Sequence, residues 1–331
     1  MSFFFQLLLI MSFTLLEATP PISQQKALYP RKFFKWKSSK EGQGLYANIL
    51  WSSEWLYHVK QHPNYGLDMS WEGVYSPGAD TFRELFQEFE DDQVSLDGRK
   101  GERIQRRKGI KVRWGTRRDL DYPEIVFSGI RSTYDCIMAN SFALYTDPGF
   151  DVYRRRMHSV ITKFFKPVKK LQDKIDFFTA QMGADKDVVK IGIHVRCCHH
   201  YCYENFDQNP ATDYLDKIEK DIDKIMESRD LSKTKIFLAT LMQPLVDRLC
   251  AKYDVVVVPD VPRTANIYAD WADIASEDPL NRQRDAIVDV WCLSKCDELW
   301  GGASNIMVFS GCLNPELKIN LLPSLSDCNS M

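Results

Sequence analysis

The second half of the chain alternates short apolar runs with longer stretches in which apolar residues recur at helical spacing. The runs predict strands at 188–195, 235–240, 255–258, 298–300 and 317–321. The longer stretches predict helices at 212–226, with Thr212 or Asp213 as cap, at 245–252 and at 284–296. Such alternation is typical of a parallel sheet covered by helices on both faces, so we expect an α/β fold.

The first half carries a weaker version of the same pattern. We expect a strand at 33–36, a turn containing Gly42 and Gly44, a helix that ends near His62 and a strand at 66–71. The strongly polar stretch 91–118 predicts an exposed, mobile loop. Apolar spacing over 152–178 indicates an amphipathic helix that is interrupted at Pro167.

The chain's 331 residues exceed what one hydrophobic core comfortably holds. A change of pattern after Gly183 divides the chain into an N-terminal lobe, 32–185, and a C-terminal lobe, 186–331. Residues 1–19 have the apolar run of a signal peptide, and 20–31 follow as a Pro- and Gln-containing stem. An uncleaved type II anchor is the alternative. In both cases, we expect the rest of the chain to lie in the secretory-pathway lumen or outside the cell. If the signal is cleaved, we expect no stable membrane span.

Composition narrows the partners and the compartment. With 44% hydrophobic and 27% charged residues the chain is globular, and its net charge of −2 gives no footprint for nucleic acid. The aromatic share of 12% suits either carbohydrate-facing surfaces or a large core. Nine cysteines fit an oxidising compartment, where disulfides form, and an odd number leaves at least one of them unpaired.

Polar residues with binding chemistry stand where three predicted strands end. Ligands of open parallel sheets bind at the carboxyl ends of the strands. His194 and Arg196 point to one side by alternation, and a guanidinium there can hold a phosphate through two hydrogen bonds. Alternatively, Arg196 pairs with a carboxylate and His194 packs in the core. Thr240 ends the next strand.

The third strand end offers backbone donors as well as a hydroxyl group. Gly301 and Gly302 precede Ser304 at the start of a helix, where backbone N–H groups can donate hydrogen bonds to an anion. Alternatively, Ser304 is a plain N-cap. The turn that contains Gly42 and Gly44 could also bind an anion through its backbone N–H groups. The alternative is an ordinary tight turn that binds no ligand.

Three segments resemble the superfamily of α-1,6-fucosyltransferases, nodulation protein Z and protein O-fucosyltransferases. They are the run Ile191-Gly192-Ile193-His194-Val195-Arg196, the run from Ile236 to Thr240, and the longer block from Asp285 through Trp300 to Asn305. The resemblance covers 187–322, and the first lobe is similar only in its glycine turn and long helix. It implies a GT-B-like architecture of two Rossmann-like lobes, with the donor site in the C-terminal lobe.

The resemblance also implies an inverting, metal-independent transfer of fucose from GDP-fucose to a glycan or protein acceptor, with no cofactor. Arg196 would neutralise the donor diphosphate as it leaves, and Ser304 would contact a phosphate oxygen. His194 and Asp289 would contact the nucleoside. Glu204, ten residues after His194, occupies the offset of the family's candidate base, and a surface glutamate is its alternative.

One departure from the family pattern leaves other functions open. After Arg196 the family continues with a basic residue, Thr, Asp and Lys, whereas this chain has Cys197, Cys198, His199, His200, Tyr201 and Cys202. The loss of Asp and Lys puts the donor's identity in doubt. The run could instead bind zinc, although structural zinc ligands usually come as two separated pairs, or form disulfides in the lumen. A non-catalytic protein of this fold that binds glycans or peptides is the remaining alternative.

Overall fold

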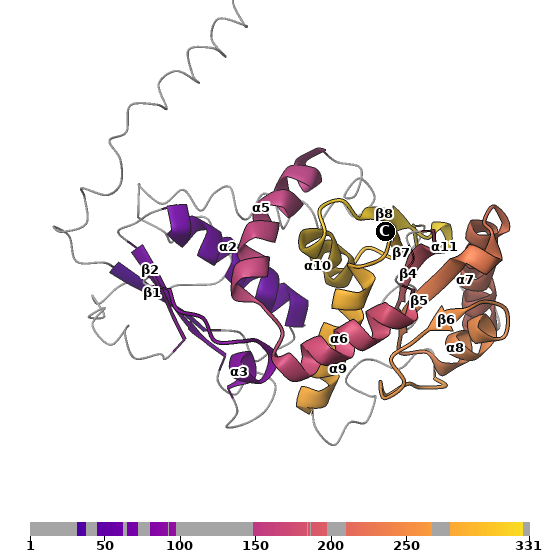
Figure 1. Cartoon of the computed structure of the whole chain (residues 1–331), viewed down its shortest axis with the longest axis horizontal. Coiled ribbons are helices and arrows are strands. Elements are labelled where there is room, and N and C mark those ends of the chain that lie inside the picture. The colour runs from indigo at the N-terminus through magenta and orange to yellow at the C-terminus, as the bar shows by residue number, and fades with distance from the viewer. Residues whose placement is uncertain are drawn as a thin grey trace, which may run out of the picture.

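The computed structural model describes ten segments of the chain. They are 32–37, 45–61, 65–71, 80–91, 93–96, 148–183, 185, 187–196, 210–266 and 279–326. Within these ranges the protein is built from two parallel sheets and the helices between and beside them (Figure 1).

The first sheet has the strand order β1-β2-β3 and is parallel throughout. Its strands are β1 (Lys32–Lys37), β2 (Tyr65–Ser70) and β3 (Val94–Ser95). Helix α2 (Leu45–Gln61) connects β1 to β2, and the short helix α3 (Thr81–Leu85) follows β2. The expected strand–helix–strand order of this half is therefore present.

The second sheet has five parallel strands in the order β6-β5-β4-β7-β8. They are β4 (Val189–Val195), β5 (Thr234–Thr240), β6 (Val255–Val256), β7 (Glu298–Gly301) and β8 (Lys318–Leu321). All five predicted strands form. The third, β6, is shorter than the predicted 255–258.

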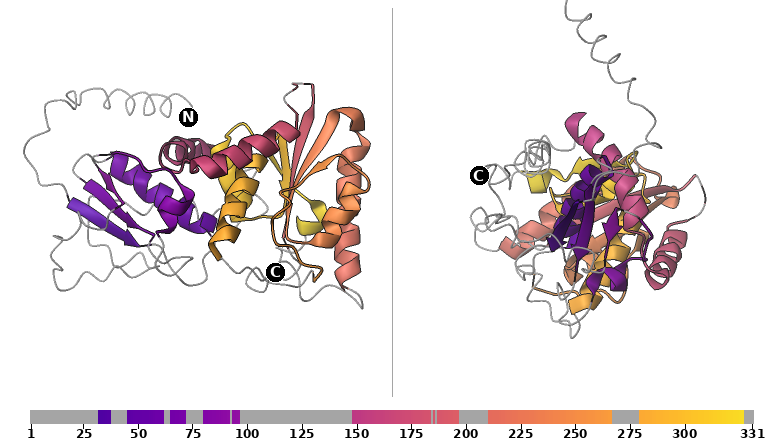
Figure 2. Two further views of the ribbon diagram at one scale, coloured as in Figure 1. Left: turned by 60° about the horizontal axis from the view of Figure 1, so that its bottom comes forward. Right: turned by 90° about the vertical axis from the view of Figure 1, so that its left-hand side faces the viewer.

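Strand alternation divides the apolar residues of the second sheet between two faces. Ile236 and Leu238 of β5 pack in a cluster with α7 (Pro210–Glu227) and α8 (Gln243–Cys250). Phe237 and Ala239 belong to a second, larger cluster on the opposite face. Helices on both faces were expected from the sequence, and Figure 2 shows them flanking the sheet.

Helices pack between the two sheets (Figure 2). Besides α2, they include α5 (Pro148–Phe164), α6 (Lys169–Gln181), α9 (Pro279–Leu293) and α10 (Asn305–Leu313). Their apolar sides share one hydrophobic cluster that runs from Leu67 of the first sheet to Phe237 of the second. The division into two lobes between residues 185 and 186 remains a prediction. Residues from both sides of that boundary share the hydrophobic cluster. The chain's last short helix, among the described residues, is α11 (Pro323–Ser326).

The predicted break at Pro167 is confirmed. Helix α5 ends at Phe164, α6 begins at Lys169, and the Pro167 carbonyl accepts a hydrogen bond of 2.9 Å from the side-chain amide of Gln87. Proline lacks the N–H that a continuous helix would need at this point. The break brings α5 and α6 into contact with the segment after α3.

Two local predictions are wrong. Helix α7 begins at Pro210, so Thr212 and Asp213 lie in its first turn rather than at the cap. Proline suits this position because the first helical N–H has no intrahelical acceptor. The polar stretch from Asp91 is not exposed at its start, because the Asp91 side chain is only 4% exposed and pairs with Lys60 and Lys163 at 2.9 and 2.8 Å. Residues 97–118 lie outside the described segments.

Much of the described aromatic content forms core. The rings of Phe82, Phe86 and Phe165 lie around the buried Trp71, with centroids 6.0 to 6.4 Å from its own. In the described ranges, no helix has both the length and the apolar character that crossing a bilayer requires. The predicted signal peptide 1–19 and stem 20–31 lie outside them.

Candidate functional site

The structure brings the three polar strand ends together at one edge of the second sheet. Val195 pairs with Thr240 across β4 and β5, and His194 pairs with Gly301 across β4 and β7. Since all these strands are parallel, their carboxyl ends open to the same side. Doubly wound sheets bind ligands at this edge. His194, Thr240 and Gly301, which the sequence analysis identified, lie along it.

His194 is buried at this edge, with 5% of its surface exposed. Burial, and then the positive charge of Arg196, lower the pKa of the His194 imidazole to about 3. The ring is therefore neutral at pH 7. Its Nδ1 atom lies 3.5 Å from the hydroxyl oxygen of Ser304. If that hydroxyl donates to Nδ1, the ring carries its proton on Nε2 and presents an N–H donor.

Ser304 is also the N-cap of α10. Its backbone is extended, at φ −158° and ψ 159°, and its side-chain oxygen accepts a hydrogen bond of 3.3 Å from the Met307 amide. The N-cap interpretation of this residue is confirmed, and the anion-site interpretation stays a prediction. The first N–H groups of a helix lack intrahelical acceptors and carry partial positive charge, which suits an anion.

Gly301 lets β7 lie directly against the end of β4. A Cβ atom at this position would collide with the backbone carbonyl oxygen of His194. Only glycine therefore allows the close pairing of His194 with Gly301 that places Ser304 three residues later beside the imidazole.

Arg196 stands one residue beyond β4 and is partly buried. Its carbonyl oxygen accepts a hydrogen bond of 2.9 Å from the hydroxyl of Tyr214, which lies buried in α7. Tyr214 thus fixes the backbone from which the guanidinium extends. Sequence reasoning missed this residue, since an aromatic at an apolar helix position gives no sign that its hydroxyl turns back to a strand.

Thr240 has a local structural role. Its buried hydroxyl accepts a hydrogen bond of 3.2 Å from the Met242 amide and so shapes the turn into α8. The segment after β6 is fastened to the same corner. The Thr264 amide donates to the Leu241 carbonyl at 2.8 Å, and the Gln243 amide donates to the Thr264 carbonyl at 3.0 Å.

Asp289 belongs to a second centre, on α9 and next to the segment that follows β6. Within the described ranges, its buried Oδ1 atom has no hydrogen-bond partner. Burial raises the pKa of Asp289 to about 8, Arg263 opposes that rise, and Asp285 adds to it. Among the described residues, no hydrogen bond joins Asp289 to His194 or Ser304.

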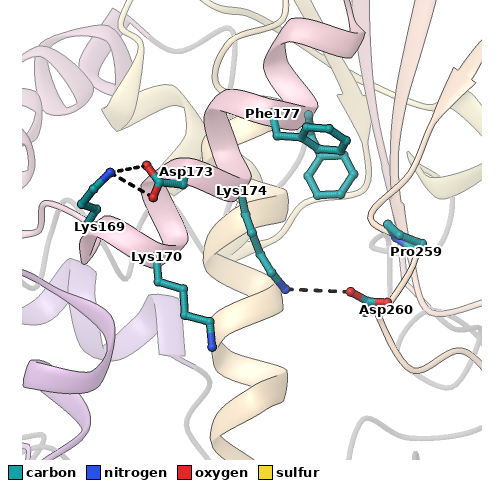
Figure 3. A pocket seen from close by; sticks show the side chains of 8 residues that line it. Lys169, Lys170, Asp173, Lys174, Phe177, Pro259 and Asp260 are labelled. Carbon is teal, nitrogen blue, oxygen red and sulfur yellow. Dashed lines mark hydrogen bonds and ion pairs between the residues drawn. The ribbon is translucent and has the colours of Figure 1, made fainter.

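A hollow of about 630 Å³ opens between α6 and the segment after β6 (Figure 3). Lys174 extends across it toward Asp260, with 4.0 Å between Nζ and Oδ2, and Phe177 is 59% exposed beside it. Burial, chiefly, raises the pKa of Asp285 to about 6, with Lys174 lowering it and Asp260 raising it. Lys174 and Asp260, which line the hollow, thus act electrostatically on Asp285 of α9.

Several predicted site residues lie outside the described segments. They are Gly42, Gly44, Glu204 and the run Cys197, Cys198, His199, His200 and Cys202. The four cysteines inside the described ranges, Cys250, Cys292, Cys296 and Cys312, are free thiols, so the predicted disulfides are not among them. The described residues also contain no cluster of three or more acidic, histidine or cysteine side chains arranged to hold a metal ion.

Two parallel α/β units with the polar edge in the second define the class of fold as GT-B-like, as the sequence predicted. No protein-family model and no curated protein matches the chain by sequence. Several solved structures match the chain by their fold. A NodZ α-1,6-fucosyltransferase soaked with GDP-fucose matches with a TM-score of 0.54 and 16% identity, over 86% of this chain and 93% of that one.

Two further structures match in the same way. NodZ from Bradyrhizobium gives a TM-score of 0.53 and 16% identity, over 86% of this chain and 94% of its own. FUT1 of Arabidopsis thaliana in complex with GDP gives 0.47 and 15%, over 88% and 70%. The NodZ matches show that this chain shares their fold, which the sequence predicted.

Proposed function

We propose that the chain is a glycosyltransferase that moves fucose from GDP-fucose to a glycan or protein acceptor, with inversion and without a metal ion. The observation that carries the proposal is the strand edge itself. A neutral His194, the N-terminus of α10 at Ser304, and Arg196, whose positive charge acts on the imidazole, lie at the carboxyl ends of β4 and β7. The NodZ structures of the same fold were soaked with GDP-fucose or crystallised with GDP.

Each group at this edge has a chemical task in such a transfer. The glycosidic bond of the donor breaks as negative charge grows on the diphosphate, and Arg196 and the first amides of α10 would stabilise that charge. His194 adds no positive charge because its ring is neutral, so it would act as a hydrogen-bond donor or acceptor. Glu204 is our proposal for the base that takes the acceptor's proton.

The first test is calorimetric titration of the protein with GDP and with GDP-fucose in the presence of EDTA. The matched pair of variants is Arg196→Ala and Arg248→Ala. Within the described segments, the Arg248 guanidinium on α8 bonds the carboxylates of Asp216 and Glu219 on α7. We expect binding in EDTA that Arg248→Ala preserves and Arg196→Ala weakens by about tenfold or more, the value of a charge-assisted hydrogen bond.

Transfer is tested separately from binding. With radiolabelled GDP-fucose, the wild type is expected to release GDP and label a glycan or protein acceptor, and Glu204→Gln is expected to lower kcat with little change in GDP affinity. Absence of binding to either nucleotide would contradict the proposal. Tight GDP binding with neither hydrolysis nor transfer would instead support a non-catalytic binding protein. We further propose that the protein acts in the secretory-pathway lumen, which immunolocalisation of the full chain would test.

A further inference from the structure

The short helix after β8 is fastened to α7 by a buried carboxylate. Helix α11 begins at Pro323, and the Ser324 amide donates a hydrogen bond of 2.7 Å to Oδ2 of Asp221 on α7. The Asp221 side chain is only 5% exposed. The first amides of a helix lack intrahelical acceptors, so Asp221 supplies from another helix the acceptor that a capping residue would otherwise provide. Its first turn thus holds α11 against α7 (Figure 1).

Apolar side chains complete this attachment. Leu322, which precedes α11, and Leu325 within it are fully buried in the cluster that contains Ile218 and Ile222 of α7. The Leu325 amide donates to the Leu322 carbonyl at 2.9 Å, which closes the turn between them. We refer to Asp221, Leu322 and α11 together as the clasp. A hydrogen bond to a carboxylate and the burial of two leucines both stabilise it.

The clasp is joined directly to the sheet edge that carries the candidate site. The Leu322 amide donates to the Gly301 carbonyl at 2.9 Å, next to the paired ends of β7 and β8. On its other side Gly301 pairs with His194 of β4, so closely that a side chain would not fit. Three residues later, Ser304 caps α10 and lies 3.5 Å from Nδ1 of His194. A displacement of Leu322 would therefore be transmitted to the turn between Gly301 and Ser304.

Helix α7 holds two neighbouring strand ends through one of its faces. Tyr214 and Asp221 are seven positions apart, which is about two helical turns, so they lie on the same side of α7. The Tyr214 hydroxyl bonds the Arg196 carbonyl just beyond β4. Asp221 holds α11, and the residue before α11 bonds Gly301 at the end of β7. The position of Arg196 relative to the start of α10 therefore depends on both contacts with α7.

We propose that Asp221 is a positioning residue of the donor site, which holds α11 against α7 and so keeps the Gly301–Ser304 turn at the separation from Arg196 that a diphosphate requires. The inference rests on the proposed function, in which Arg196 and the first α10 amides share the charge of the departing diphosphate. Asp221 acts through the backbone of Leu322 and Gly301. Loosening the clasp leaves each binding group in the chain and changes the distances between them, which lowers affinity because such sites depend on preorganised geometry.

The test combines amide hydrogen exchange with GDP titration of the full chain. Asp221→Ala removes the acceptor of the Ser324 amide, whereas Asp221→Asn keeps a side-chain oxygen at the same place. In Asp221→Ala, exchange should become about threefold faster or more in 301–308 as well as in 322–326, and GDP affinity should fall by a similar factor. Asp221→Asn should restore most of both, which a loss of charge alone would not predict.

Asp223→Ala is the matched control. Asp223 lies on the same helix, and its carboxylate accepts hydrogen bonds from Lys252 at 2.9 Å and from the Tyr253 hydroxyl at 2.6 Å, both in the segment after α8. The control should lose stability but bind GDP and exchange in 301–308 as the wild type does. Should Asp221→Ala fail to fold, Leu325→Ala replaces it and removes the apolar part of the clasp. Faster exchange in 301–308 together with weaker GDP binding is then the supporting result.

The outcomes also distinguish this inference from the proposed function. If the wild type binds GDP and Asp221→Ala binds it equally well, the role of Asp221 is overturned and the fucosyltransferase proposal still stands. Faster exchange confined to 322–326 would likewise show that the clasp does not fix the turn before α10. If the wild type does not bind GDP, the proposed function and the donor-site role of Asp221 both fail, and the exchange data show separately whether the clasp holds the turn.

Discussion

The hydroxyl oxygen of Ser304 lies 3.5 Å from Nδ1 of His194, which joins the start of α10 to the end of β4. The imidazole is neutral at physiological pH because it is buried and lies near Arg196. The charge of a bound diphosphate would therefore be met by the Arg196 guanidinium and the α10 amides rather than by an imidazolium. The residues that position His194, Ser304 and Arg196 should therefore affect nucleotide binding when they are substituted.

Ser304→Ala is expected to cost stability and, more strongly, nucleotide affinity. The variant loses the N-cap bond from the Met307 amide, worth about 1 kcal/mol, and the contact with His194. Chemical denaturation and GDP titration measure the two effects. Asp230→Ala is the control, because Asp230 caps a short turn through the Ser232 amide at the opposite end of β5 and should lose stability alone. Equal GDP affinity in Ser304→Ala and the wild type would speak against an anion site at α10.

Tyr214→Phe removes only the hydroxyl that donates to the Arg196 carbonyl. We expect a loss of about 1 kcal/mol in the free energy of unfolding, together with weaker GDP binding because the Arg196 backbone is less constrained. Tyr253→Phe is the matched control, since the Tyr253 hydroxyl bonds the carboxylate of Asp223 away from the strand edge. If both variants bind GDP as the wild type does, the Tyr214 bond is structural only.

Gly301→Ala should be far more damaging than Gly311→Ala. The new methyl group at 301 meets the backbone carbonyl of His194, which cannot move without breaking the pairing of β4 and β7. At 311 it meets the end of the Ile319 side chain at 2.7 Å, which can turn away. We expect at least about 1 to 3 kcal/mol at 301, the cost of overpacking, and less at 311. Comparable denaturation midpoints for the two variants would contradict the close approach at Gly301.

The sequence was sufficient for features that local chemistry determines. Alternation along β5 sends Ile236 and Leu238 to one face and Phe237 and Ala239 to the other, as a buried parallel strand requires. Pro167 had to break its helix because it lacks an N–H. A hydroxyl after two glycines at a strand end predicted the cap at Ser304, because backbone donors and capping residues have a recognisable local pattern.

The features that could not be predicted from the sequence are contacts between side chains that lie far apart along the chain. Tyr214 reaches Arg196 from the adjoining helix, and Asp91 is buried because Lys163 arrives from more than seventy positions away. Arg263 acts electrostatically on Asp289, which lies 26 positions later in the sequence, and this effect depends on the folded arrangement. A charged residue in a polar stretch looks the same in sequence whether it ends in solvent or against a buried carboxylate.

Asp289→Asn is expected to change how stability depends on pH. The pKa of Asp289 is raised to about 8 in the folded protein, chiefly by burial, whereas an unfolded Asp titrates near 4. Between those values the folded state binds more protons than the unfolded state, so the free energy of unfolding falls as pH rises. His194 acts in the opposite direction. Its pKa is lowered to about 3, so protonation of the unfolded chain lowers stability as pH falls below about 6.5.

Comparing Asp289→Asn with the wild type at each pH cancels the His194 contribution. Near pH 4 the two proteins should unfold with similar free energies, because the carboxyl group of the folded wild type is neutral. Between pH 4 and pH 8 the unfolded chain loses a proton that folded Asp289 keeps, so the variant should become progressively more stable than the wild type. By pH 8 the difference should be at least about 1 kcal/mol, the equivalent of one pKa unit. Urea denaturation at pH 4, 6, 8 and 9.5 measures the difference. A constant difference across the series would mean that Asp289 titrates like a solvent-exposed aspartate.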